Sequence, residues 1–218
     1  MAIAYDAGSG VNSGSASSHT HSHTTGSGSN RFITIGITLG ASRTINSVTY
    51  AGVTCVQLVA KTMTYHGGGN MEIWGVYAPA AGANNVVVTL SSATNAQLCV
   101  NTFTGVNQSN TIDATGTSHT TTSSSSVSVT TIADNCVLCG ISKDDAGGAT
   151  AGADTTIGGI PNAGSGDHSW YSTTARTPAG SHSLAYSAGG SGQWDSAAVS
   201  LAPPPTSRVP LLSLLGVG

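Results

Sequence analysis

Charged side chains are scarce in this chain. Its 218 residues include six Lys or Arg and nine Asp or Glu, together 7% of the sequence, against roughly 25% in an ordinary soluble domain. Ser, Thr, Asn and 29 Gly take their place. Because a soluble monomer normally carries mixed surface charge, this neutral surface predicts a subunit whose faces are covered by other copies of itself.

Basic clusters and membrane-spanning runs are also missing. The six cations are scattered along a chain of net charge −3, so no patch can neutralise a row of phosphates, and we expect no nucleic-acid partner. The opening MAIAYDAGSG lacks the charged and apolar regions of a signal peptide. The longest apolar stretch, VPLLSLLGVG, is too short to cross a bilayer. We therefore expect synthesis in a cytoplasm and no membrane insertion.

Helical periodicity is nearly absent, whereas strand patterns recur with turn residues between them. Arg31 to Leu39 alternates isoleucines with Thr and Gly, and residues 47–61 form a hairpin pattern around Ala51-Gly52. Further short strands are expected at 84–91 and 96–106, among a total of ten to twelve. The sequence predicts an all-β fold, an antiparallel two-sheet β-sandwich that is jelly-roll-like and spans residues 1–202.

Two tracts have low sequence complexity. Residues 8–30 and 115–126 consist mostly of Ser, Thr and Gly, a composition typical of flexible segments. We expect contacts with other copies of the chain to order them.

Four cysteines, Cys55, Cys99, Cys136 and Cys139, lie inside apolar runs. Such cysteines usually act as small buried hydrophobes, and a disulfide or a metal site is the alternative. Cys136 and Cys139 have CxxC spacing, but residues three apart on a strand face opposite sides, which disfavours a shared metal.

An HxHxH run at His19, His21 and His23 is the candidate metal site. On a strand the three rings share one face, roughly 7 Å apart, and in a trimeric fibre they could gather around an axial ion. The alternative is packing with Ser and Thr on an edge strand. No other cofactor is expected.

Catalytic patterns are lacking. Glu72 is the only glutamate, so a glycosidase carboxylate pair would need aspartates. The adjacent Asp167, His168 and Ser169 are not a triad, because triads are assembled from separate segments. A Gly/Ala-rich stretch contains Asp144, Asp145 and Asp154, whose oxygens could bind calcium. Their spacing does not fit an EF-hand, so we expect a solvated loop. The sequence predicts a non-enzymatic protein.

Aromatic residues support an alternative function, because sandwich modules can stack sugars on exposed rings. Trp170, Tyr171 and Trp194 flank glycine-rich stretches and are the candidate sugar-binding residues, with a host-surface glycan as ligand. Trp74 lies in an apolar run and is expected in the core.

The composition changes after Leu201. Residues 203–218 begin with three prolines, which favour an extended spacer, and continue as an apolar arm. The arm residues are Val209, Leu211, Leu212, Leu214 and Leu215. Such an arm either folds back on its own sandwich or docks on a neighbouring subunit, and we favour docking.

Four stretches, SNRFITIGIT, SVTYAGV, MEIWGVYAPAAGANNVVVTLS and NTFTGVNQSN, resemble β-sandwich modules of bacteriophage virion structural proteins and of bacterial surface proteins. The resemblance covers roughly residues 4–202 and implies a structural or adhesive module without site residues. We expect a virion protein, a capsid decoration or auxiliary subunit that contacts its own copies and a major capsid protein. The alternatives are a tail or fibre component, or a carbohydrate-binding adhesion module at a cell surface or outside the cell.

Overall fold

The computed structural model describes residues 2–65, 67–145, 148–159, 166–188 and 192–205. In this part of the chain fifteen strands form three antiparallel sheets, A, B and C, which pack on one another. The predicted all-β sandwich class is confirmed. A third sheet is added to the two that were expected.

The sheets contain the following strands. Sheet A has the order β4 (Val53–Thr54), β3 (Ile45–Tyr50), β7 (Gly82–Thr104), β2 (Phe32–Leu39), β6 (Asn70–Tyr77) and β5 (Val56–Thr62), with β1 (Ala4–Thr25) also paired to β7. Sheet B has the order β12 (Thr155–Ile157), β13 (Asp167–Ser172), β10 (Val137–Asp144), β15 (Trp194–Leu201) and β8 (Ile112–Thr120). Sheet C has the order β11 (Thr150–Ala151), β14 (Ser181–Ser187) and β9 (Ser124–Thr130).

β1 and β7 form one long antiparallel ribbon that bends near its middle. The pairing register shifts twice between Ser13 and Ser18, as at β-bulges, which bend and twist a strand. Beyond the bend, the second half of the ribbon lies over its first half. The contact between Ser9 Oγ and His23 Nδ1, which lie 2.7 Å apart, shows this arrangement. Sheet A is therefore folded over on itself.

The fold divides sheet A into two layers. We call the outer layer β4, β3, residues 82–90 of β7 and residues 18–25 of β1, and the inner layer β5, β6, β2, residues 96–104 of β7 and residues 4–13 of β1. A hydrophobic core of residues from both layers lies between them, including Ile33, Ile35, Val48, Val88 and Leu98.

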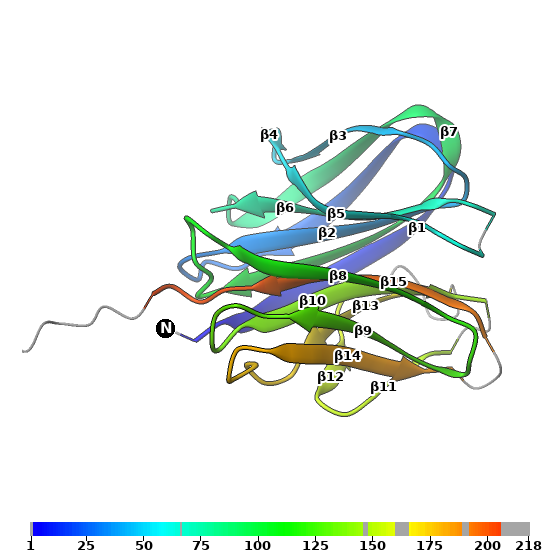
Figure 1. Ribbon diagram of the computed structural model, residues 1–218. Coiled ribbons are helices and arrows are strands. Elements are labelled where there is room, and N and C mark those ends of the chain that lie inside the picture. The colour runs from blue at the N-terminus through cyan, green and yellow to red at the C-terminus, as the bar shows by residue number, and fades with distance from the viewer. Residues whose placement is uncertain (1, 66, 146–147, 160–165, 189–191, 206–218) are drawn as a thin grey trace, which may run out of the picture.

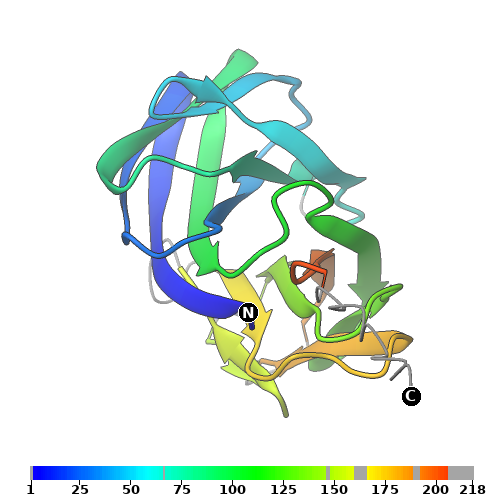
Figure 2. The same ribbon diagram turned by 90° about the vertical axis from the view of Figure 1, so that its left-hand side faces the viewer.

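Two further cores hold the layers together. Met71, Ile73 and Phe103 of the inner layer pack against residues of sheet B such as Ile141 and Val199. The opposite face of sheet B packs against sheet C. The molecule is a stack of four layers, with the N-terminal half of the chain in sheet A and the C-terminal half in sheets B and C (Figures 1 and 2). The sequence predicted one sandwich over residues 1–202; the structure instead stacks two.

β2 shows why its sequence alternates. Its isoleucines enter the core inside sheet A, while Thr34 and Gly36 face sheet B. A Cβ atom at Gly36 would lie 2.2 Å from Ile141 Cγ2, so glycine lets the two sheets approach. All eight residues of the strand are buried. The alternation therefore separates two interiors, because β2 belongs to the shared middle layer.

The predicted hairpin turn is confirmed, but the second strand is not continuous. Ala51 and Gly52 have φ angles of 50° and 78°, the positive values that a tight hairpin turn requires. β4 ends after two residues and Cys55 enters the core. The chain then continues as β5, which pairs with β6.

The low-complexity tracts are ordered within the chain itself. Residues 4–25 form β1, which pairs with β7 over nearly its whole length, and residues 115–126 span the end of β8, the connection at 121–123 and the start of β9. The expectation that these tracts need other copies for order is wrong. The partner of β1, strand β7, merges the two strands expected at 84–91 and 96–106 into one strand of 23 residues.

All four cysteines are buried and free, which confirms the prediction of core thiols. Burial raises the pKa of Cys55 and Cys139 to about 12 and that of Cys136 to about 11, and it raises the pKa of Cys99 well above the ordinary thiol value.

Candidate functional site

Few charged side chains are exposed on the surface, and those that are exposed already make contacts within the chain. Among the described residues, the exposed charged side chains are four aspartates: Asp6, Asp134, Asp145 and Asp154. The first three accept hydrogen bonds from the backbone amides of Gly26, Ala179 and Gln193 at 2.6–2.8 Å. Asp154 lies 3.5 Å from the Arg176 guanidinium. Each exposed charge therefore anchors a neighbouring loop.

Within the described ranges, the two outermost faces of the stack carry no charged residue. On sheet C the outward side chains of β9 and β14 are Ser124, Ser126, Ser128, Thr130, Ser181, Ser183, Ala185 and Ser187. On the outer layer of sheet A, β1 presents Ser18, Thr20, Ser22 and Thr24. These uncharged faces of hydroxyl and methyl groups form the candidate functional surface, because they permit close approach of another backbone without like-charge repulsion.

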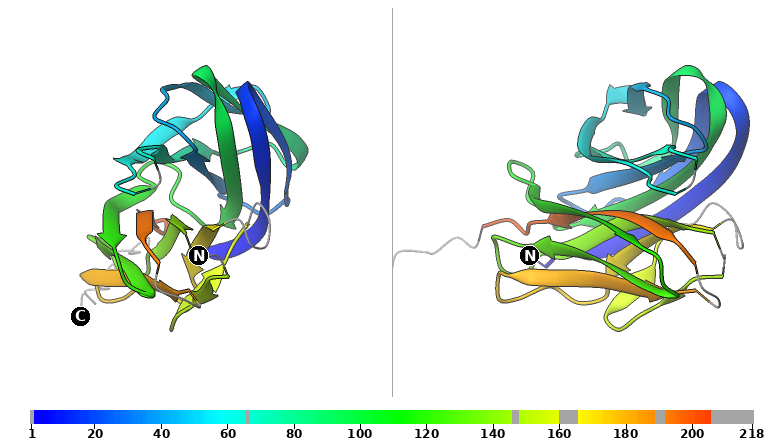
Figure 3. Two further views of the ribbon diagram at one scale, coloured as in Figure 1. Left: turned by 90° about the vertical axis from the view of Figure 1, so that its right-hand side faces the viewer. Right: turned by 45° about the vertical axis from the view of Figure 1, so that its right-hand side comes forward.

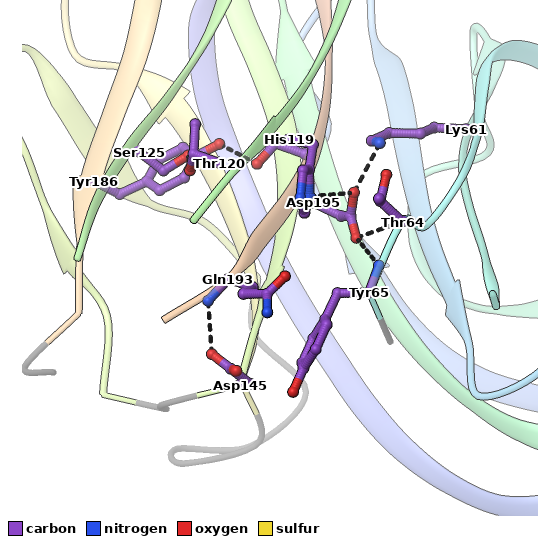
Figure 4. A network of polar contacts seen from close by, with 11 residues as sticks. Lys61, Thr64, Tyr65, His119, Thr120, Ser125, Asp145, Tyr186, Gln193 and Asp195 are labelled. Carbon is purple, nitrogen blue, oxygen red and sulfur yellow. Dashed lines mark hydrogen bonds and ion pairs between the residues drawn. The ribbon is translucent and has the colours of Figure 1, made fainter. Parts of the chain in front are cut away.

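Buried charge is concentrated where the two halves of the molecule meet. Asp195 of β15 is fully buried, and its carboxylate lies 2.7 Å from Lys61 Nζ of β5 and 3.3 Å from His119 Nδ1 of β8 (Figure 4). The backbone amides of Thr64 and Tyr65 donate to its second oxygen. Sequence analysis missed this network, whose only signal was the rarity of lysine.

Competing effects set the pKa of Asp195. Burial alone would raise that pKa, but Lys61 and the two backbone amides outweigh burial and hold the pKa below its ordinary value. The carboxylate thus stays ionised and links sheet B to the β5–β6 connection. The carboxylate is held by contacts from β5, β8 and the β5–β6 connection.

The adjacent Asp167, His168 and Ser169 make separate contacts. Lys143 Nζ lies 2.8 Å from Asp167, whereas the His168 ring contacts Asp144 at 3.1 Å. Asn101 Nδ2 donates to Ser169 Oγ at 3.0 Å. Burial raises the pKa of Asp167, and Lys143 partly opposes this rise. No hydroxyl–imidazole–carboxylate chain connects the three.

Glu72, the only glutamate, is buried on β6. Its Oε2 accepts hydrogen bonds from Gln57 Nε2 at 2.7 Å and from Trp74 Nε1 at 2.9 Å. Trp74 itself is half-buried and packs against the core of sheet A, where the sequence placed it. The carboxylate is occupied by structural contacts.

The three histidines point to one side of β1, as the strand spacing predicted. His19 and His23 are buried, and His21 is half-buried. Ser9 Oγ lies within hydrogen-bond distance of both His21 Nε2 and His23 Nδ1, and His23 Nε2 contacts Thr102 Oγ1 at 2.7 Å. These bonds tie the outer layer of sheet A to its inner layer.

The ring nitrogens of His21 and His23 are thus used within the chain, whereas His19 Nε2 is buried without a hydrogen-bond partner. Burial, with a smaller contribution from His21, lowers the pKa of His23 to about 4, and burial also lowers the pKa of His21. Both rings are therefore neutral at pH 7. In the described part of the chain, no three His, Cys, Asp or Glu side chains converge as metal ligands would.

The candidate sugar-binding tryptophans are buried, so their expected exposure is wrong. Trp170 donates to Ser142 Oγ at 2.7 Å and stacks on Tyr186 with ring centroids 4.9 Å apart. Trp194 also contacts Tyr186. Tyr171 is half-buried and stacked on Tyr5 at 4.2 Å. These rings fill the spaces between layers because a stack of four layers needs large side chains in its interior.

The C-terminal arm lies outside the described residues, with Val209, Leu211, Leu212, Leu214 and Leu215 among them. Ala202, which precedes the proline spacer, forms backbone hydrogen bonds with Asn107 and Thr111. Pro203, Pro204 and Pro205 line a cavity of 270 Å³ together with residues 133–135. The described part of the chain thus ends at Pro205, beside this loop.

Comparisons with known proteins give no family. No family model, no curated protein and no solved structure matches this chain. Among the described residues no helix is present that is long and apolar enough to cross a membrane.

Proposed function

We propose that this protein is a non-enzymatic virion structural subunit, a capsid decoration or auxiliary protein that associates with its own copies. The observation that carries the proposal is the distribution of charge. Every exposed charged side chain of the described residues anchors a loop, and both outermost faces of the stack are uncharged. Such faces suit contact with other protein surfaces better than solvation as a monomer.

Attachment is assigned to the C-terminal arm. At ~25 cal/mol per Å², burial of ~400 Å² of apolar surface contributes on the order of 10 kcal/mol before ordering costs. The three prolines separate the arm from sheet B, so that it can reach a neighbouring subunit or a major capsid protein. The proposed location is the virion, and the mechanism is mechanical.

Three experiments test this function. Electron micrographs of native particles that contain the chain are expected to show it on the capsid, whereas density on the tail would favour the fibre alternative. Co-sedimentation of the full chain with these particles is expected, and removal of residues 206–218 should abolish it while the circular dichroism of a β protein remains. Sedimentation velocity of the full chain should show self-association; a monomer at the highest soluble concentration contradicts the proposal.

The adhesion alternative loses its predicted platform, since Trp170 and Trp194 are buried. Of the aromatic side chains described, Tyr65 and Tyr77 are exposed, at 49% and 38%. A glycan array with the full chain tests the alternative directly.

A further inference from the structure

In the described part of the chain, β1 is hydrogen-bonded to another strand along only one of its two edges. It pairs with β7, and no other strand in the described part of the chain pairs with it. Figure 3 shows β1, in dark blue, running along β7 at the margin of sheet A. Beyond the register shifts, residues 18–25 form a regular run of eight residues opposite residues 82–89 of β7.

Among the described residues, the other strand edges are short, irregular or covered. β4 and β11 have two residues each and β12 has three. β5 is irregular in its pairing with β6 and carries Lys61. The edges of β8 and β9 lie against each other. A Cβ atom at Gly116 of β8 would lie only 2.1 Å from the carbonyl oxygen of Ser128 of β9. Natural sheets use these devices to prevent edge-to-edge association.

The edge at residues 18–25 has no such protection. It contains no charge and no proline, and no charged residue occurs between Asp6 and Arg31. Its outward side chains Ser18, Thr20, Ser22 and Thr24 are all exposed hydroxyls. By the same rule that explains the other edges, an exposed regular edge of this length indicates pairing with another strand.

We propose that residues 18–25 of β1 pair antiparallel with the same residues of a second copy. This inference rests on the self-association in the proposed function and names the surface that carries it. A two-fold axis makes such a contact self-complementary, and identical uncharged edges bring no like charges together. The outer layers of two subunits would then form one continuous sheet, with hydroxyl side chains facing one another across the new pair.

Lysines on the edge test the pairing. In the full chain, Thr20→Lys combined with Ser22→Lys places four positive charges across the two-fold axis and should raise the dimer dissociation constant about 100-fold. Thr49→Lys is the matched control, because Thr49 lies on the same layer but on β3, separated from the edge by β7. If face-to-face stacking formed the dimer, Thr49→Lys would weaken it as well. Thermal unfolding of each variant confirms that it is folded.

Cysteine scanning gives a direct readout. Single substitutions Ser18→Cys, Thr20→Cys, Ser22→Cys and Thr24→Cys, oxidised under native conditions, should give a disulfide-linked dimer at the position nearest the axis. The native thiols are at most 3% exposed, so they do not compete.

Three outcomes are distinguishable. Loss of the dimer in the edge variant, retention in the control and a cross-link in the scan support the pairing. Self-association that the edge lysines leave unchanged overturns this inference and leaves the proposed function standing. A wild-type chain that stays monomeric overturns both.

Discussion

Lys61 Nζ lies 2.7 Å from Asp195 Oδ1, and this ion pair joins β5 of sheet A to β15 of sheet B. Because Asp195 is fully buried, the pair links the two halves of the molecule at one of the few places where charge enters the interior.

Replacing Asp195 should destabilise the protein strongly. Asp195→Ala leaves the Lys61 ammonium and two backbone amides without their acceptor, and a loss of about 3 kcal/mol in the free energy of unfolding is expected. Denaturant titration measures it. Asp154→Ala removes an ion pair whose carboxylate side chain is 63% exposed and should cost less than about 1 kcal/mol. Equal losses in the two variants would contradict a special role for the buried pair.

Acid should weaken the contact between the layers of sheet A. The pKa of His23 is about 4 in the folded protein, whereas an unfolded histidine titrates near 6.5. The unfolded state thus binds the proton first, so stability is complete above pH 6.5 and decreases as the pH falls toward 4. Denaturation midpoints at pH 7 and pH 5 measure this decrease. His23→Gln should reduce the difference between the two midpoints; an unchanged difference would rule out His23 as its source.

Gly36 should tolerate no larger side chain. Gly36→Val drives methyl groups into Ile141 of sheet B and is expected to cost about 2–3 kcal/mol of unfolding free energy. Ile141→Ala creates space, so the double variant should be more stable than the sum of the single losses predicts. Gly14→Ala is the control, since nothing lies within 4 Å of its Cβ position. Strict additivity in the cycle would show that the two residues do not contact each other.

The thiols should be unreactive in the native state. Burial of all four side chains and their raised pKa values leave almost no accessible thiolate at pH 8. A thiol reagent should therefore label none of them on the folded chain within minutes and all four in denaturant. The pKa of Cys136 is lower than that of Cys55 or Cys139. Rapid labelling of Cys136 in the native protein would show that its loop opens.

The local sequence pattern predicted several elements, because interactions between residues close in sequence determine them. The alternation around Ile33 and the turn at Ala51-Gly52 needed only strand period and the steric freedom of small residues. The cysteines were assigned to the core because each lies in an apolar run. The candidate surface could likewise be anticipated from the scarcity of Lys and Glu.

Long-range packing decided what the sequence could not show. Trp170 and Trp194 lie next to glycine-rich stretches, and only the stacking of sheet C on sheet B buries them. The serine-rich tract at residues 8–30 carries no hydrophobic signal, so its pairing with β7 follows from the folded sheet. The contacts of Asp195 and Lys61 join residues more than 130 positions apart.

By itself, the sequence determined the all-β class, the buried thiols and a surface nearly free of charge, because composition and strand period act locally. Only the tertiary structure decided that the β1–β7 ribbon bends into two layers, that His21 and His23 bond to side chains of the inner layer, and that residues 18–25 lie at a sheet edge with no further strand partner among the described residues. Those features depend on which distant backbone segments meet, and hydrogen bonding between strands is nearly independent of side-chain identity.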